Sequence, residues 1–236
     1  QLDQFAQTIA EAIELAALFL REVKLLEVRR EGELVRRIER MDAGEGRLRL
    51  KDETGRTASW LLFQGDFAAE AERLREQYAW QIEAKRSSEV RLALPVEQRL
   101  QHGRLFAVLP TETRTPLPFH INADFYPTTD RKRIHLEEGY QAEWNQAALL
   151  AVAEVLAARL EMLPQELGAE GLWHVLQQVA ETERQAQTGD LAPIFAAFWQ
   201  ALAPLLSETA LLYTAQGAWV KPAEARLVEG VAAQEA

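Results

Sequence analysis

Residues 116–133, PLPFHINADFYPTTDRKR, decide the fold of this chain. Apolar and polar side chains alternate from residue 119 to 126, with Phe119, Ile121, Ala123 and Phe125 on one side and His120, Asn122, Asp124 and Tyr126 on the other. This period of two is typical of a β-strand that turns one face toward a core. Pro127 has no N–H to donate, so we expect the strand to end there.

A compact cationic turn follows this strand directly. Residues 128–130 are Thr-Thr-Asp, types that cap helices or stabilise turns, and residues 131–133 are Arg-Lys-Arg. Two interpretations remain open for the turn: an anion-binding corner or the solvated start of a helix. The polar side of the strand has two interpretations as well, because its side chains either serve a site or bond to neighbouring strands and turns.

Charge is divided unevenly along the rest of the chain. Residues 1–136 carry 22 Lys/Arg and 22 Asp/Glu, whereas residues 137–236 carry 4 and 14, which accounts for the whole net charge of −10. This asymmetry makes the C-terminal region a poor partner for nucleic acid or an anionic membrane. There is no cysteine, no signal peptide and no apolar run near the ~20 residues that span a bilayer. We therefore expect a cytoplasmic protein without a membrane partner.

The first half of the chain predicts an α+β domain. An amphipathic helix is expected at 2–21, followed by an antiparallel meander of strands at 23–30, 33–42, 46–52 and 57–64. Asp66 is a suitable N-cap for a helix that runs to about Arg86. Strands at 89–96 and 103–109 precede the one at 118–126. The pattern favours a mixed sheet with its helices on one face.

The second half predicts a helical module. Helices are expected from Trp144 to Leu163, ended by Pro164, then at 169–187, and then from about residue 190. The last of these would bury Ile194, Phe198, Leu202 and Leu205. Two short strands around Gly217 complete the module. The expected organisation is therefore a connecting helix at 1–22, an α+β middle domain at 23–138, and a helical module at 139–236 with a terminal hairpin at 210–221.

No motif of a self-contained enzyme is present. The four histidines, at positions 102, 120, 135 and 174, share no metal-ligand spacing, so no metal site is expected. The sequence contains no Gly-x-Ser-x-Gly, phosphate-loop or Gly-x-Gly-x-x-Gly pattern. Any site must therefore come from less regular groupings, of which the cationic turn is the most distinctive.

Three pieces of the chain resemble one protein family in the same order. They are residues 117–133 with Trp144-Asn145, residues 103–110 (GRLFAVLP) and residues 217–222 (GAWVKP). The pattern is similar to the segment after the ATP module of sacsin-type proteins, which belong to the GHKL ATPases related to heat-shock protein 90 chaperones. The resemblance touches roughly residues 20–228.

The resemblance implies a fold and a role. The middle domain of that family has the fold of the second domain of a small-subunit ribosomal protein and extends a basic side chain to the γ-phosphate of ATP. Arg131 is the first candidate for this contact, with Lys132 and Arg133 next, and the nucleotide-proximal candidates are Asn122, Thr128 and Thr129. The upstream ATP signatures are missing here and the chain opens on Gln1, so we expect a fragment of a longer parent ATPase.

The resemblance also sets expectations about ligands and partners. ATP and Mg would bind in the parent protein, with no cofactor in this fragment, which would be inactive alone. The partners would be the upstream ATP-binding domain and client proteins, with a homodimer possible. Nucleic acid binding through the sheet is a weaker interpretation, because that region lacks a net basic charge.

A different class of function stays open as an alternative. The chain would then be a non-catalytic protein-interaction scaffold, and its cationic turn would only cap a helix. Trp173, Trp199 and Trp219 favour this alternative, because they exceed what a small helical layer needs.

Overall fold

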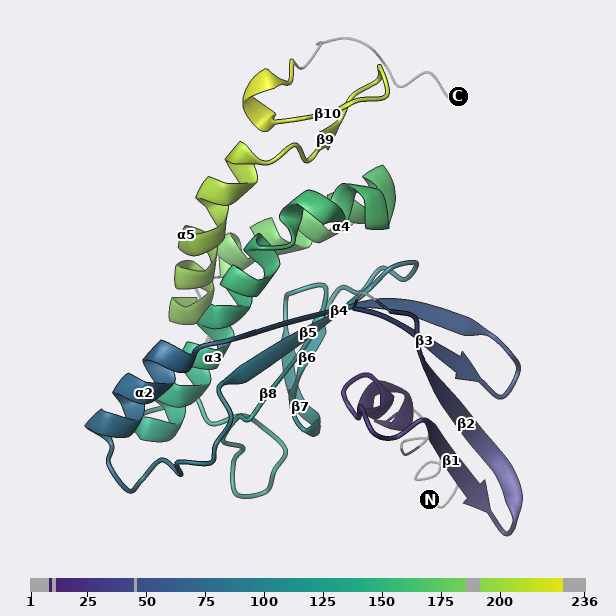
Figure 1. Ribbon diagram of the computed structural model, residues 1–236, viewed down its shortest axis with the longest axis vertical. Helices are drawn as coiled ribbons and strands as arrows, with labels where there is room; N and C mark the ends of the chain where they lie inside the picture. Colours follow the sequence, from purple (N-terminus) through teal and green to yellow (C-terminus); the bar gives the residue numbers. More distant parts are fainter. Residues whose placement is uncertain (1–8, 10–11, 45, 186–191, 227–236) are drawn as a thin grey trace.

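The structure is a computed structural model that describes residue 9 and residues 12–44, 46–185 and 192–226. It is a mixed α+β fold built on a curled eight-stranded sheet (Figure 1). The strands are β1 (Leu25–Arg30), β2 (Glu33–Asp42), β3 (Arg47–Asp52), β4 (Thr57–Asp66), β5 (Glu89–Pro95), β6 (Gly103–Ala107), β7 (Leu109–Thr115) and β8 (His120–Ala123). Their order is β1-β2-β3-β4-β5-β8-β6-β7, and the β6–β8 pair is parallel while the other pairs are antiparallel.

The antiparallel meander β1–β4 is confirmed within two residues of each expected boundary. The sequence analysis missed β7, which forms a hairpin with β6. Pro110 near the start of β7 weakened the strand pattern, but β7 lies at the edge of the sheet, where a residue without an N–H is tolerated. Gly103 opens β6 beneath the chain that leads into β8, and a Cβ there would lie only 1.9 Å from the carbonyl oxygen of Phe119. The backbones approach so closely that only glycine fits.

Apolar side chains cover both faces of the sheet. On one face, Leu61 and Phe63 of β4 join a large core with α2 (Ala68–Gln77) and α3 (Tyr140–Ala157). On the other face, Trp60 joins a smaller core with Leu18 and Phe19, which follow the helical residues 12–17. The expectation that all helices share one face is therefore wrong. The rest of the expected helix at 2–21 lies outside the described residues.

The helix α2 is shorter than expected. The N-cap position is Phe67 and not the expected Asp66, which is the last residue of β4 and accepts a hydrogen bond from the Ala68 N–H at 2.9 Å. The helix ends at Gln77 instead of near Arg86. A series of turns follows, in which Trp80 has a φ of +69°. Arg86 lies beyond these turns, and its side chain binds Asp124 just after β8, as described below.

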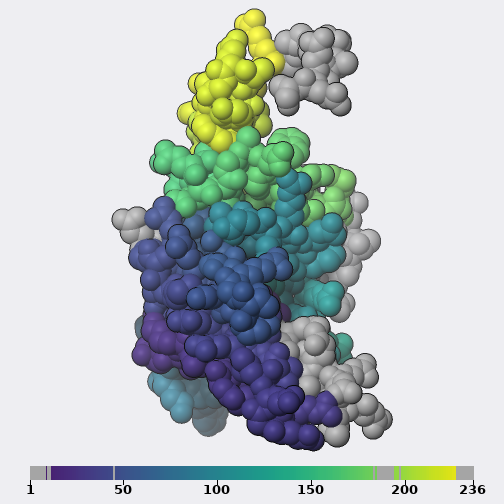
Figure 2. All heavy atoms as spheres, turned by 90° about the vertical axis from the view of Figure 1, so that its right-hand side faces the viewer, coloured from purple at the N-terminus to yellow at the C-terminus, as the bar shows by residue number. Residues whose placement is uncertain are grey.

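The helical module contains α3, η1 (Leu160–Met162), α4 (Leu163–Gln185), α5 (Ala192–Glu208), β9 (Leu212–Tyr213), β10 (Trp219–Val220) and η2 (Pro222–Glu224). Pro164 lies in the first turn of α4, where its missing N–H costs nothing, so it does not end the preceding helix as expected. Ile194, Phe198 and Leu202 are buried as expected, whereas Leu205 is 43% exposed. The short β9–β10 pair forms the expected terminal hairpin, and Figures 1 and 2 show it at one end of the molecule.

Candidate functional site

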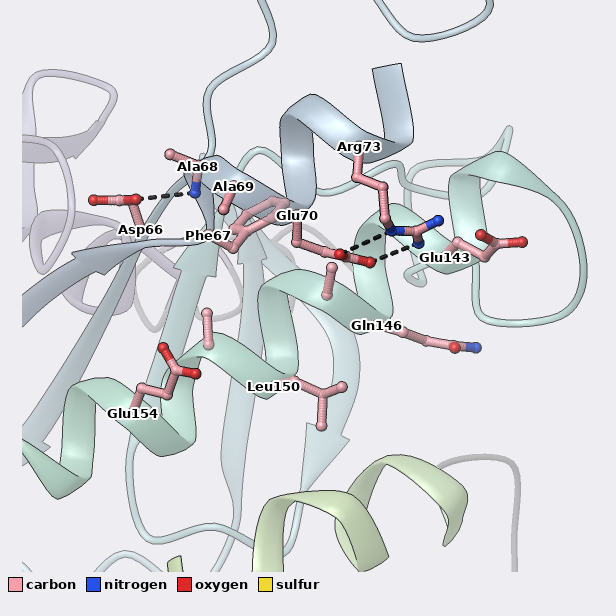
Figure 3. A pocket seen from close by; sticks show the side chains of 12 residues that line it. Asp66, Phe67, Ala68, Ala69, Glu70, Arg73, Glu143, Gln146, Leu150 and Glu154 are labelled. Atoms are coloured by element: carbon pink, nitrogen blue, oxygen red, sulfur yellow. Dashed lines mark hydrogen bonds and ion pairs between the residues drawn. The ribbon is translucent and has the colours of Figure 1, made fainter. Parts of the chain in front are cut away.

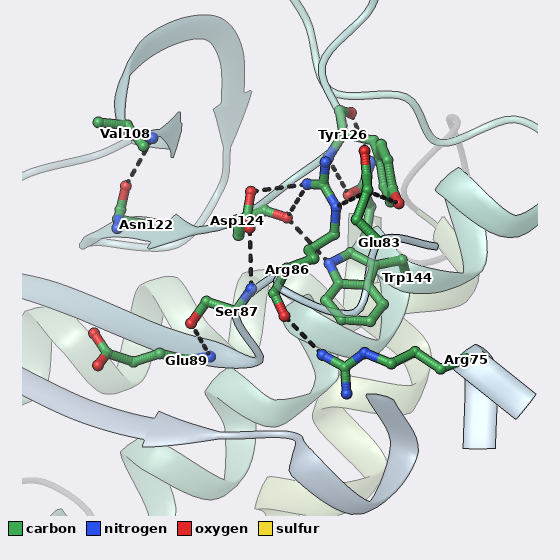
Figure 4. Close-up of polar contacts among 11 residues, drawn as sticks. Arg75, Glu83, Arg86, Ser87, Glu89, Val108, Asn122, Asp124, Tyr126 and Trp144 are labelled. Atoms are coloured by element: carbon green, nitrogen blue, oxygen red, sulfur yellow. Dashed lines mark hydrogen bonds and ion pairs between the residues drawn. The ribbon is translucent and has the colours of Figure 1, made fainter. Parts of the chain in front are cut away.

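On the polar side of β8, His120 is buried beside the smaller core and Asn122 is partly exposed. The ring of His120 lies 5.6 Å from the rings of both Trp60 and Phe106, and its Nδ1 accepts the Arg104 N–H at 3.1 Å. Burial, together with the charge of Arg104, lowers the pKa of His120 to about 4, so the ring is neutral at physiological pH. Asn122 accepts the Val108 N–H at 3.1 Å and thereby holds the tip of the β6–β7 hairpin (Figure 4). Both side chains bond to neighbouring strands.

A polar network fixes the chain just after β8 (Figure 4). Arg86 donates to the carboxylate of Asp124 at 2.8 Å and to its backbone carbonyl at 2.9 Å. The guanidinium also lies 3.6 Å above the ring of Tyr126, a cation–π contact. Glu83 accepts hydrogen bonds from Arg86 at 3.1 Å and from the Tyr126 hydroxyl at 3.0 Å. Each charge in this group therefore has an opposite partner.

The α3 residues Trp144 and Asn145 support the same segment. The Trp144 indole N–H donates to the Asp124 carbonyl at 3.1 Å. The fully buried Asn145 accepts the Tyr126 N–H at 2.7 Å and donates to the carbonyls of Tyr126 and His135 at 2.8 and 2.7 Å. Asn145 thus joins the two ends of the chain segment between residues 126 and 135. Burial raises the pKa of Tyr126 to about 12, so its hydroxyl stays protonated.

Between those ends the chain forms the basic loop, which we define as residues 128–133. Pro127 and Ile134 form an isolated antiparallel bridge at its base. The Thr128 hydroxyl donates to Asp130 at 2.6 Å and accepts the Arg133 N–H at 3.1 Å, while Asp130 also accepts the Lys132 N–H at 3.1 Å. These bonds, with the Thr128 hydroxyl first, lower the pKa of Asp130. The basic loop is a closed turn and no helix starts in it, so the helix-start interpretation is wrong.

The three cations of the basic loop differ in their surroundings. All three are exposed. Lys132 forms an ion pair with Glu112 of β7 at 3.7 Å. Arg131 and Arg133 form no side-chain hydrogen bond or ion pair with any residue in the described ranges. Arg131 also has a φ of +58°, a backbone conformation that costs a non-glycine residue roughly 1–2 kcal/mol. The loop thus exposes two guanidiniums that no ion pair engages within the described part of the chain, with Asp130 as the nearby carboxylate that interacts with Arg133.

Five of the six candidate site residues lie together in the basic loop, and Asn122 lies apart from them on β8. Thr128, Thr129 and the cations share the basic loop, where Thr128 supports its backbone and Thr129 is exposed. Asn122 lies on β8 and binds the β6–β7 hairpin instead. Sequence reasoning missed the supporting side chain Arg86, because its partners lie 38 and 40 residues away.

Away from the basic loop, a hollow lies between α2 and α3 (Figure 3). It has a volume of about 510 Å³ and an apolar floor that includes Phe67 and Leu150. Four carboxylates line it (Asp66, Glu70, Glu143, Glu154). Arg73, its only lining cation, binds Glu70 through two hydrogen bonds of 2.9 and 2.7 Å, which lower the pKa of Glu70. The bound Arg73 leaves no free cation among the lining residues.

The tryptophans that favoured a scaffold occupy different environments. Trp173 on α4 is 60% exposed, whereas Trp199 and Trp219 are half-buried against the core. Trp80, at 95% the most exposed large apolar side chain among the described residues, lies within the helix expected up to about Arg86, where the sequence pattern offers no reason to single it out. Trp173 and Trp80 therefore remain as exposed aromatic surface.

Comparisons with known proteins leave the family open. A scan against protein-family models found no match, and searches of the curated proteins and of the solved structures found none either. None of the helices in the described ranges is long and apolar enough to cross a bilayer. The functional argument therefore depends on the geometry of this chain.

Proposed function

We propose that the chain is the middle region of a chaperone-like GHKL ATPase and that its basic loop supplies a cation to the γ-phosphate of ATP. The nucleotide, with Mg, would be held by an upstream domain, and this region would couple nucleotide state to the binding of client proteins. The observation that carries the proposal is the pair of exposed guanidiniums at Arg131 and Arg133, which have no ion-pair partner among the described residues.

Physical chemistry supports a phosphate as the target of this loop. A guanidinium stays charged at all physiological pH values and offers a planar set of donors that matches phosphate oxygens. Charge that develops on the transferring phosphoryl group is stabilised best by donors that need no reorganisation. The bonds from Thr128 and Asp130, with the Asn145 contacts behind them, fix the backbone from which the guanidiniums extend. Arg131 is the first choice for the contact, followed by Lys132 and Arg133.

The architecture is compatible with the proposed domain type. The proposal takes this mixed sheet, with its parallel β6–β8 pair and with α2 and α3 packed on one face, as a variant of the fold of the second domain of a small-subunit ribosomal protein. The order of the motif residues also agrees with the sacsin-type segment described above. The proposed protein would work in the cytoplasm, and dimerisation would be a property of the parent.

Turnover of ATP by the longer protein tests the proposal. We expect Arg131→Ala to lower kcat by about 10²-fold or more, because the loss of one preorganised donor to a developing charge has that magnitude. Lys132→Ala and Arg133→Ala identify the alternatives. Arg99→Ala is the matched control, since Arg99 is an exposed arginine on a surface ion pair. If all three basic-loop variants turn over ATP like the wild type, the role of the loop at the γ-phosphate is wrong.

A protein-interaction scaffold remains the second candidate function. The exposed indoles of Trp80 and Trp173 favour it, because tryptophan is enriched at the energetic centres of interfaces. In that case the basic-loop variants would leave ATP turnover unchanged or the parent would have none. Loss of a bound partner on Trp80→Ala, with all loop variants unaffected, would support this candidate.

A further inference from the structure

An apolar groove crosses the outer side of the helical module. We define the groove by its lining residues, which come from α4 (Trp173, Leu176, Gln177, Ala180, Arg184), α5 (Trp199, Leu206) and the terminal segment (Leu211, Leu212, Pro222). Its volume is about 450 Å³. The α4 residues recur every three or four positions, so they form one continuous stripe along that helix. The groove is therefore a surface made by three separate elements.

The groove leaves large apolar side chains in contact with water. Trp173 is 60% exposed, and four further apolar side chains that line the groove are partly exposed (Leu176, Trp199, Leu206, Leu212). Contiguous apolar surface of this kind marks interaction sites on soluble proteins. A folded chain gains nothing from such exposure, whereas an occupant would remove it from water at roughly 25 cal/mol per Å².

The charges around the groove indicate which kind of partner would bind there. The cations beside it are already paired, Arg184 with Glu181 at 3.1 Å and Lys221 with Glu208 at 3.5 Å. The Glu224 carboxylate accepts the Lys221 N–H, so three carboxylates (Glu181, Glu208, Glu224) lie beside two cations at this groove. The whole region from residue 137 onward carries 4 Lys/Arg against 14 Asp/Glu. This negative charge attracts a partner that carries cations around its apolar face. It repels a second copy of the same acidic module.

We propose that this groove binds an amphipathic helix of a partner protein, with leucine-type side chains in the groove and Lys or Arg on its flanks. A helix that lays an apolar stripe into a groove between helices is a recurring mode of peptide recognition. Trp173 would close over the bound helix as the main anchor, and Glu208 and Glu224 would face its cations. This inference stands apart from the proposed contact with ATP, because it uses no residue of the basic loop.

A pair of synthetic peptides tests the inference on the intact chain. The first is an 18-residue amphipathic helix of leucine and lysine, and the second has glutamate at every lysine position. We expect the lysine peptide to bind by fluorescence anisotropy and the glutamate peptide to bind at least about tenfold more weakly. Equal binding of both peptides, or no binding of the lysine peptide, would overturn the proposal.

Variants locate the binding and separate it from general attraction to an acidic protein. Trp173→Ala removes an exposed side chain, so the fold should survive, and we expect about tenfold weaker binding of the lysine peptide. Leu34→Ala, a control that also removes an exposed apolar side chain but on β2, should change binding less than twofold. Glu208→Lys should weaken the lysine peptide and strengthen the glutamate peptide. Equal effects of Trp173→Ala and Leu34→Ala, or a dimer that Trp173→Ala dissociates in sedimentation, would contradict the assignment.

Discussion

The chain just after β8 and the basic loop that follows it are neighbours in sequence, yet they are held in different ways. Around Asp124 and Tyr126 each charge is paired, and Arg86, Trp144 and Asn145 form hydrogen bonds with the backbone of these two residues. A few residues later, Arg131 and Arg133 point outward without an ion pair among the described residues. The comparison separates residues that stabilise the fold from residues that are free to bind something else.

Removing the Asn145 side chain should have the largest effect on stability, because it supports the segment around Tyr126. Asn145→Ala leaves the Tyr126 N–H and the His135 carbonyl without their buried partner, while the Tyr126 carbonyl keeps only the His135 N–H at 3.0 Å. We expect a loss of about 3 kcal/mol in the free energy of unfolding, measured by urea denaturation. Gln146→Ala on the same helix turn is the control and should cost less than about 1 kcal/mol. A loss at Asn145 no larger than the control would show that water replaces the amide, and the clamp at the base of the loop would be disproved.

The buried histidine of β8 predicts a pH dependence of stability with a definite sign. The pKa of His120 is lowered to about 4 in the fold, from an ordinary value of 6.5 that applies to the unfolded chain. A proton therefore binds the unfolded chain more readily between these values, so stability is full above pH 6.5 and falls as the pH drops toward 4. Between pH 7.5 and 5 we expect a loss of about 2 kcal/mol.

The measurement is a series of urea titrations of the wild type and of His120→Gln across that pH range. Glutamine keeps an acceptor for the Arg104 N–H but cannot titrate. The difference between the free energies of unfolding of the two proteins should change with pH by this loss. The titration of carboxylates affects both proteins equally and drops out of the difference. Parallel curves for the two proteins would mean that His120 is protonated without cost in the fold.

Local pattern was enough to predict some of these features and insufficient for others. The alternation of Phe119, Ile121 and Ala123 correctly placed a buried strand face, because period and burial are linked within a few residues. The same pattern could not show that His120 faces a second core, since the residues that cover it, Trp60 and Phe106, come from other strands. Likewise, a run of Thr-Thr-Asp-Arg-Lys-Arg is equally suited to a helix start and to a closed turn. The bridge from Pro127 to Ile134 that decides between them is a tertiary contact.

The smallest expected effect on stability is that of a substitution in the basic loop. Arg131→Gly removes the guanidinium and relieves a positive φ of +58°. The relief of roughly 1–2 kcal/mol is offset by the larger conformational entropy of glycine in the unfolded chain, about 0.5–1 kcal/mol. Net stability in urea should therefore stay within about 1 kcal/mol of the wild type and lie on the stabilised side. A loss greater than that would mean that Arg131 has a partner within the fold, and its availability to an external anion would be excluded. If stability is retained and the longer protein loses ATP turnover, the Arg131 guanidinium contacts the nucleotide and does not stabilise the fold.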